Sequence, residues 1–539
     1  MTLTALYFYL YQLSKLVEDS RRAEPLELKA NPLELEAGGP LIVVMNREDA
    51  AELGVHSSDR IFVRSEKDYA ICIINLSSED PRGEIGIYRE VVKKLTIIKG
   101  DSLTVELARR PEGLDFVREK INGERLTPWK IEKIVGDVVE RRLSDIEMAA
   151  FVTAMHIHGI GMEEVEALSR TMIWSGKTID FGRSPILDKH SIGGVPGDKT
   201  TLIVTPTIAA AGYTIPKSSS RAITSPAGTA DRMEALAPVD IEFSEIRRIV
   251  EEIGACIVWG GNIDLAPADD LFIRIEYPLS IDPLLLPSIM SKKKAMGSTH
   301  VVIDIPTGIG AKISTMGEAE QLSSDFIELG NRFDMRIECA ITEGSQPIGY
   351  NIGPVLEARE ALETLFGKGP HELVDKATTL AGILFEMVGH ENGKQMAYDM
   401  IMSGKSLGKM REIIEAQGGD PEVKPEDLVP GSHVYDVLAP RDGRILWFNN
   451  RDLVKIAKAA GTPNDKGAGI QLFAKTGDKV KQGEPMYRIY SEKASKLENA
   501  IKQLENFTIM EIGSKVGEQM LKKRIGKITA PSREFILDR

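Results

Sequence analysis

The chain has 539 residues, of which 42% are hydrophobic and 27% charged, and its formal net charge is −13. This length predicts several domains, and the composition is that of an ordinary soluble protein. The acidic balance argues against a general nucleic-acid binder, so an anionic ligand would have to be held by local positive groups. Cys72, Cys256 and Cys339 are too few and too scattered for a disulfide framework or a metal cluster, which indicates a reducing cytoplasm.

The N-terminal region divides into an apolar start and a β-rich segment. Residues 1–11 are apolar and aromatic. The run is too short to cross a membrane and no basic segment precedes it, so we expect neither a membrane span nor a signal peptide. Residues 41–44 and 60–63 are predicted strands, and residues 46–54 a helical turn that ends at a glycine. Together they resemble a small double-psi-like β-barrel with a structural or assembly role.

From residue 127 the pattern becomes helical. Thr127-Pro128 predicts a helix with proline at its first position. Ser144-Asp145-Ile146-Glu147 is a capping box that predicts a second helix, and a third is expected over 162–174. The second helix is predicted to bury a face made of Ile146, Phe151, Ala154 and Met155.

A Gly-rich stretch at residues 188–201, Asp-Lys-His-Ser-Ile-Gly-Gly-Val-Pro-Gly-Asp-Lys-Thr-Thr, is the centre of the chain. Pro185-Ile186-Leu187 before it predicts the end of a buried strand, and residues 202–211 after it predict a helix. Glycines let the backbone approach a ligand closely, and the first N–H groups of the helix favour an anion. Such a turn can be only a tight connection, but the added polar side chains favour an oxyanion site, for phosphate above all: Lys189, Ser191, Thr200 and Thr201.

A second polar loop follows at residues 217–229, in which five hydroxyl side chains from Ser219 to Thr229 flank Arg221. Thr229 is predicted to cap the next helix, with Asp231 in its first turn. The loop follows a predicted strand over 213–216, so both loops can emerge at the same carboxyl edge of one parallel sheet, where such sheets bind ligands. The alternative is a Ser-rich surface loop.

The remaining chain predicts a mainly parallel sheet and a different C-terminal region. Strands are expected over 256–259, 272–275 and 300–306, and helices over 284–296, 315–330, 352–365 and 370–390. Residues 475–485 predict two turns around a short strand. Lys475 and Lys479 could suggest a carrier lysine, but neither stands at the centre of a hairpin.

The two polar stretches, together with Ser288-Ile289-Met290-Ser291-Lys292-Lys293, resemble the thymidine/pyrimidine nucleoside phosphorylase family, and within it the archaeal-type AMP phosphorylase branch. The similarity runs from about residue 128 to about 491, and for the AMP branch from about 41. It implies an α/β fold with a helical domain and a large mixed α/β domain separated by a cleft, an N-terminal β-barrel-like domain and a C-terminal lipoyl-like hammerhead subdomain. The expected limits are 1–115 for the β-rich domain, 127–185 plus about 280–297 for the helical domain, 186–278 plus 298–433 for the phosphate-binding domain, and 434–539 for the hammerhead-like domain.

The resemblance implies phosphorolysis of nucleoside 5′-monophosphates, in which AMP and phosphate give adenine and ribose 1,5-bisphosphate, with CMP and UMP as further substrates. It implies no cofactor and no metal. Inorganic phosphate would be held by Lys189, Ser191, Thr201, Ser219 and Thr229. The nucleotide would be contacted by Gly194, Ser220, Arg221, Ala222, Ile223, Thr224, Ser225, Thr229, Ser288, Lys292 and Lys312. Asp282 would protonate the leaving base, and Lys189 would be the second catalytic residue.

These assignments compete with simpler ones. Asp282 could cap a helix that starts with proline, and Lys292 belongs to a lysine run that could be a solvated face. Arg221 and Lys312 exceed what a neutral ribose needs, and leaving them unpaired would be costly, which favours a second phosphate on the 5′ position. Arg221 could instead pair with a structural carboxylate, with Lys312 solvated.

Three other functions are compatible with parts of the sequence. They are a pyrimidine nucleoside phosphorylase on the same fold, a phosphoribosyltransferase of the anthranilate type, for which Asp231 is the only suggestion of an acidic metal ligand, and a non-catalytic nucleotide-binding assembly protein. The expected partners are a nucleotide and inorganic phosphate, with no nucleic acid or membrane. We expect a homodimer or larger homo-oligomer.

Overall fold

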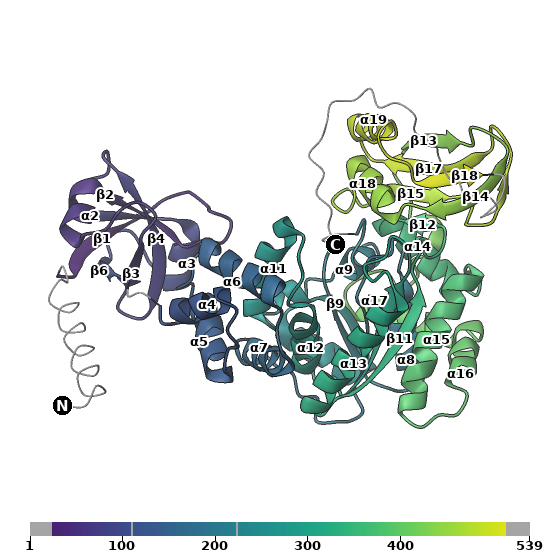
Figure 1. Ribbon diagram of the computed structural model, residues 1–539, viewed down its shortest axis with the longest axis horizontal. Helices are drawn as coiled ribbons and strands as arrows, with labels where there is room; N and C mark the ends of the chain where they lie inside the picture. The colour runs from purple at the N-terminus through teal and green to yellow at the C-terminus, as the bar shows by residue number, and fades with distance from the viewer. Residues whose placement is uncertain (1–23, 109–110, 223–224, 514–539) are drawn as a thin grey trace. The chain divides into compact units, whose positions relative to one another are not determined.

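The computed structural model describes residues 24–108, 111–222 and 225–513. Within them the chain forms two compact units, each of which combines stretches distant in sequence (Figure 1). The first unit contains the chain up to Ser175 and Ala266–Ser288, and the second contains Gly176–Leu265 and the chain from Ile289 onward. In the described part no helix is long and apolar enough to cross a membrane. The prediction for residues 1–11 lies outside the described residues.

The first unit begins with a closed β-barrel, whose strands follow the order β1-β5-β2-β4-β3-β6. These strands are β1 (Leu26–Pro32), β2 (Ile42–Asn46), β3 (Arg60–Arg64), β4 (Tyr69–Ser77), β5 (Glu84–Ile87) and β6 (Ser102–Leu107). Helix α2 (Arg47–Leu53) begins after Asn46, whose side chain accepts a hydrogen bond from the Glu48 amide, and it ends at Gly54 in the left-handed conformation. A second helix, α3 (Arg89–Leu95), packs against β4 and β2. The predicted strands and helical turn are confirmed.

The rest of the first unit is helical. Its helices are α4 (Gly113–Ile121), α5 (Pro128–Val139), α6 (Asp145–His158), α7 (Met162–Trp174) and α11 (Pro267–Leu279). The predicted starts are confirmed, because Pro128 is the first residue of α5 and Ser144 and Glu147 form the capping box of α6. The predicted buried face of α6 is wrong at Ile146, which is 82% exposed, while Phe151 and Met155 are buried.

The prediction of a strand over residues 272–275 is also wrong, because these residues lie in the middle of α11. Pro267 occupies the first turn of this helix, and Asp269 and Asp270 follow at its positive N-terminal end. Ala268, Leu271 and Phe272 are spaced three and four apart, so they form one helical face, and they are buried in the core of the first unit.

The second unit is built on parallel strands. Strand β10 (His300–Thr307) lies between β11 (Arg336–Glu343) and β7 (Leu187–Ser191), parallel to both. Strands β8 (Ile215–Ser219) and β9 (Ala255–Trp259) pair in parallel, and a parallel bridge between Ile186 and Thr214 connects them to β7. The predicted parallel sheet is confirmed, but β7 ends at Ser191 rather than at Leu187, so Lys189 belongs to the strand.

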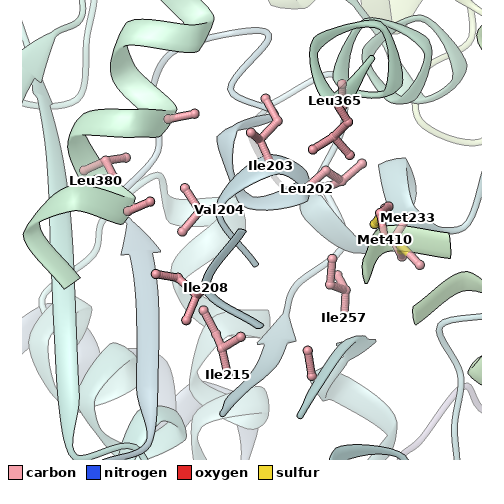
Figure 2. Packing of buried hydrophobic residues seen from close by; sticks show 14 of the residues in the cluster. Leu202, Ile203, Val204, Ile208, Ile215, Met233, Ile257, Leu365, Leu380 and Met410 are labelled. Carbon is pink, nitrogen blue, oxygen red and sulfur yellow. The ribbon is translucent and has the colours of Figure 1, made fainter. Parts of the chain in front are cut away.

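Helices surround these strands. They are α8 (Thr200–Ala210), α9 (Thr229–Met233), α10 (Phe243–Ile253), α12 (Leu285–Ala295), which spans the boundary between the units, α13 (Met316–Arg332), α14 (Pro354–Leu365), α15 (His371–Met387), α16 (Gly393–Met402) and α17 (Lys405–Ala416), with short 3-10 turns η1 (Gly260–Asn262) and η2 (Pro425–Asp427). The predicted helices near 284–296, 315–330, 352–365 and 370–390 are confirmed. Helix α8 is buried from Thr200 to Ala209. Figure 2 shows its residues Leu202, Ile203 and Val204 packed in the core of this unit.

The C-terminal part of the second unit has its own core, which includes Ile352, Leu453 and Ile489. Its elements are β12 (Asn351–Ile352), β13 (His433–Leu438), β14 (Gly443–Phe448), α18 (Asn450–Ala460), β15 (Gly469–Leu472), β16 (Lys479–Val480), β17 (Pro485–Ser491), α19 (Ala494–Gln503) and β18 (Met510–Gly513). They form two antiparallel sheets, β12-β15-β17-β13 and β16-β14-β18. The short strand predicted within 475–485 is confirmed as β16, whereas the lipoyl-like identity stays a prediction.

Candidate functional site

The Gly-rich turn connects β7 to α8. Gly193, Gly194 and Gly197 have φ angles of 81°, 91° and 79°, which side-chain-bearing residues rarely adopt. A Cβ atom on Gly194 would also lie 2.7 Å from the backbone nitrogen of Lys312, and one on Gly197 would lie 2.5 Å from the carbonyl oxygen of Ile348. Glycine is therefore required here both by backbone conformation and by close packing.

Several of the predicted phosphate ligands lie at the carboxyl edge of the parallel strands. Ser191 is the last residue of β7, and Ser219 is the last residue of β8. Thr201 lies in the first turn of α8, directly after the Gly-rich turn. Lys312 follows β10 and contacts the turn at Gly194. The sheet thus brings these residues from separate loops to one edge, as the sequence predicts.

Lys189 is buried beneath the turn and has defined partners. Its Nζ donates a hydrogen bond to Thr200 Oγ1 at 2.7 Å and lies 3.9 Å from Asp198 Oδ2. Burial lowers the pKa of Lys189, and the charges of Asp198 and Asp304 oppose this effect. An ammonium group in this position can donate to an anion at the sheet edge.

The N-terminus of α8 is partly capped from within. Asp198 Oδ1 accepts hydrogen bonds from the Thr200 amide at 3.2 Å and from Thr200 Oγ1 at 2.5 Å. Burial would raise the pKa of Asp198, but Lys189 and Lys376 hold it well below its usual value. Among the first N–H groups of this helix, which the sequence predicts to favour an anion, the Thr200 amide is therefore already bonded to Asp198.

We call residues 219–229 the serine loop. Asp231, which is almost fully buried, ties its two ends together: Oδ2 accepts hydrogen bonds from the Ala222 amide at 2.7 Å and the Gly228 amide at 2.9 Å. Gly228 is the N-cap of α9, so the prediction that Thr229 caps this helix is wrong, although Asp231 does lie in its first turn. Since the carboxylate of Asp231 is used in these bonds, the structure favours a loop-closing role over a metal ligand. The described residues contain no cluster suited to a metal ion.

Arg221 is held by a carboxylate. Its guanidinium donates to both oxygens of Glu234 at 2.7 and 2.6 Å, lies 3.3 Å from Asp231, and stacks 4.9 Å above the Trp259 ring. The hydrogen bond from Arg221, opposed by burial and aided by Lys466, lowers the pKa of Glu234 to about 2. Of the two alternatives for Arg221, the structure shows the one in which it pairs with a structural carboxylate.

Other predicted site residues have the following positions. Ser220, Ala222 and Ser225 lie in the serine loop. Ser220 is exposed, whereas Ala222 and Ser225 are partly buried, and the Ser225 hydroxyl donates to the Ala227 carbonyl at 3.0 Å. Ile223 and Thr224 lie outside the described residues. The Thr229 hydroxyl accepts a hydrogen bond from Arg232 at 3.4 Å, and the Ser219 hydroxyl donates to the Val258 carbonyl at 3.1 Å.

The residues predicted to handle the base lie around α12. Ser288 and Lys292 are four residues apart on this helix, as the sequence predicts, and the Ser288 hydroxyl donates to Asp269 Oδ2 at 2.9 Å. Asp282 precedes the helix and is exposed, and its carbonyl accepts from the Leu285 amide at 3.4 Å. The structure assigns Ser288 and Asp282 to the first unit and Lys292 to the second.

Sequence reasoning missed a set of buried charges below the site. Lys293, from the lysine run for which a solvated face is one alternative, is buried and donates to Asp188 Oδ2 at 2.7 Å, and Lys217 lies 3.4 Å from Asp188 Oδ1. Lys376 on α15 lies 2.8 Å from Asp304 Oδ2 on β10 and 3.5 Å from Asp198 Oδ2. The available signal was weak: a charged residue such as Lys376 or Asp304 inside an otherwise apolar helix or strand.

Three family models match the chain. The a/b domain of the glycosyl transferase family matches residues 183–407, its helical bundle domain matches 114–176, and the pyrimidine nucleoside phosphorylase C-terminal domain matches 447–510. AMP phosphorylase from Thermofilum pendens is 47% identical over 497 residues, covering 92% of this chain and 97% of the relative. AMP phosphorylase from Thermococcus kodakarensis is 49% identical over 496 residues, covering 91% and 98%. The chain belongs to the AMP phosphorylase family.

Among solved structures, anthranilate phosphoribosyltransferase from Thermus thermophilus matches with a TM-score of 0.49 and 19% identity, covering 56% of this chain and 99% of that one. In this member of the AMP phosphorylase family, the helical bundle model matches part of the first unit, and the a/b model matches chain of the second unit together with Ala266–Ser288 of the first. The Gly-rich turn and the serine loop both lie within the a/b match.

Proposed function

We propose that the protein catalyses the phosphorolysis of nucleoside 5′-monophosphates, converting AMP and phosphate to adenine and ribose 1,5-bisphosphate, with CMP and UMP as further substrates. The chain belongs to the AMP phosphorylase family. The observation that carries the proposal is that Lys189, Ser191 and Ser219 lie beside a Gly-rich turn at the edge of the parallel strands. The relatives' names favour this reaction over the alternative of a pyrimidine nucleoside phosphorylase.

The reaction depends more on positioning the nucleophile than on activating it. Phosphate already carries its negative charge, so positioning and charge-assisted hydrogen bonds supply most of the rate. The proposed phosphate ligands are Lys189, Ser191, Thr201, Ser219 and Thr229. A phosphate oxygen attacks C1′ of the ribose as the bond to the base breaks, and the departing base takes a proton, for which the proposed donor is Asp282.

The proposed nucleotide contacts come from the Gly-rich turn, the serine loop, α12 and the segment after β10. They are Gly194, Ser220, Arg221, Ala222, Ile223, Thr224, Ser225, Thr229, Ser288, Lys292 and Lys312. Arg221 donates to Glu234 in the structure, so binding of a 5′-phosphate would require Arg221 to exchange this bond or to share it between the two anions. The 5′-phosphate would then compete with a carboxylate that is also held by Lys466.

We further infer a cytoplasmic homo-oligomer, a homodimer or larger, that acts on small molecules. All three cysteines are free in the structure, which suits a reducing compartment.

The test of the function is product formation. The protein is incubated with AMP, CMP, UMP and the corresponding nucleosides, with and without phosphate, and free base is measured. We expect base release from AMP only with phosphate, and a higher kcat/KM for AMP than for adenosine at saturating phosphate. Equal use of adenosine would refute the 5′-monophosphate preference, and base release without phosphate would refute phosphorolysis.

A further inference from the structure

Four ionisable side chains form a buried charge network under the Gly-rich turn. Lys189 comes from β7, Asp198 from the turn, Asp304 from β10 and Lys376 from α15, and all four are buried. Two carboxylates and two ammonium groups leave the network without net charge. Burying such groups is costly unless each one is compensated by the others, so their arrangement determines which charge remains available to a ligand.

The distances within the network are unequal. The Lys376 Nζ lies 2.8 Å from Asp304 Oδ2 and 3.5 Å from Asp198 Oδ2, whereas the Lys189 Nζ lies 3.9 Å from Asp198 Oδ2. Thr342 donates a hydrogen bond to the other oxygen of Asp304 at 2.6 Å. Lys376 therefore makes the shorter contact to Asp198 and directly pairs with Asp304.

This arrangement affects Lys189 through charge. The attraction between two charges falls with distance and is strong in the poorly hydrated interior. Burial would lower the pKa of Lys376, but Asp198 and Asp304 outweigh it and raise the pKa, so Lys376 carries a full charge. Because Lys376 pairs with Asp304 and lies closer to Asp198 than Lys189 does, the carboxylates hold Lys189 less strongly, and its ammonium donates to a neutral hydroxyl, Thr200 Oγ1.

We propose that Lys376 is a positioning residue for inorganic phosphate: by pairing with Asp304 and lying closer than Lys189 to Asp198, it weakens the hold of the two carboxylates on the Lys189 ammonium, which can then donate to the nucleophile. The inference rests on the proposed function and adds to it a residue that does not touch the substrate. Without Lys376, Asp198 and Asp304 share a single lysine, Lys189, which is drawn toward Asp198. The repulsion between the two carboxylates and phosphate is then no longer balanced.

The experiment compares three variants with the wild type. Lys376→Met removes the charge and keeps most of the side-chain volume. The double variant Lys376→Met/Asp304→Asn removes one positive and one negative charge and restores the balance. The control, Lys120→Met, removes another buried lysine, which pairs with Glu164 at 2.8 Å in the first unit. Lys120 is far from this network in sequence and outside the proposed site.

For each variant, KM for phosphate, KM for AMP, kcat and Tm are measured, and binding of inorganic phosphate is followed by calorimetry. We expect Lys376→Met to raise the phosphate KM and the phosphate Kd by about tenfold or more, the range of a lost charge-assisted bond, with KM for AMP changed less than about twofold. The double variant should recover phosphate binding to within about threefold of the wild type, and Lys120→Met should lower only Tm.

Three outcomes would overturn the proposal. They are an unchanged phosphate KM in Lys376→Met, an equal rise in KM for both substrates, or a double variant that binds phosphate as weakly as the single one. If Lys376→Met does not fold, the double variant decides alone, because the proposal requires it to bind phosphate nearly as the wild type does. If the wild type binds phosphate but releases no base, the proposed function fails while the calorimetry still tests Lys376.

Discussion

Replacing Lys189 by methionine tests the centre of the candidate site. The methionine fills most of the space of the buried lysine stem and removes only the ammonium group. Thr200 keeps its hydrogen bond to Asp198 at 2.5 Å, and Asp198 keeps Lys376 at 3.5 Å, so the turn retains its local partners. We therefore expect the variant to fold and to lose its interaction with phosphate.

The size of the loss follows from the type of bond. A hydrogen bond between a charged donor and an anion contributes about 1.5–3 kcal/mol, and each 1.4 kcal/mol corresponds to a factor of ten. Phosphate kcat/KM should fall by about ten- to a hundredfold, measured as release of base from AMP over a phosphate titration. Lys120→Met serves as the control for loss of a buried lysine. An unchanged phosphate kcat/KM in Lys189→Met would refute the role of this residue.

The same assay has a pH signature. Burial lowers the pKa of Lys189 below its ordinary value of 10.5, and an amine binds phosphate well only while it is protonated. Phosphate kcat/KM should therefore decline as the pH rises through this lowered pKa. In Lys189→Arg the guanidinium stays charged, so that decline should shift upward or vanish even if the overall rate is lower. An identical alkaline limb in both proteins would assign the titration to another group.

Three further predictions concern other parts of the site. Asp282→Asn should lower kcat by about 10²–10⁴-fold with little change in KM for AMP, as for loss of a general acid; a fall in Tm in proportion to activity would instead indicate a structural role. Gly194→Ala should reduce activity more than stability, because its Cβ would meet the Lys312 backbone at 2.7 Å in a φ region of +91°; wild-type kinetics would show that this turn is not part of the site. Glu234→Gln should be less stable than the wild type above about pH 4.5, and the difference in Tm should shrink as the pH falls toward 2. The reason is that the wild-type carboxylate, whose pKa is lowered to about 2, loses its ion pairs over that range. A difference in Tm that does not depend on pH would contradict the lowered pKa.

Local signals in the sequence account for the parts of the fold that were predicted. The capping box of Ser144 and Glu147, the helix-starting Pro128 and the terminating Gly54 each act through hydrogen bonds or backbone angles within a few residues, so they can be read without the fold. Residues 272–275, Phe-Ile-Arg-Ile, are predicted as a strand but lie in α11, because a short and mostly apolar run does not reveal its period. Ile146 was placed in the core for a related reason, since position next to a helix cap does not determine which face is covered.

The sequence by itself determined the Gly-rich turn, the serine loop, the parallel strands between them and the resemblance to the phosphorylase family, because these depend on residue type and local spacing. Tertiary structure alone decided how the charges are paired. Arg221 meets Glu234 across 13 residues, Lys293 meets Asp188 across 105, and Lys376 meets Asp198 across 178. Electrostatic energy depends on distance in space and on burial, and neither quantity can be read from separation along the chain.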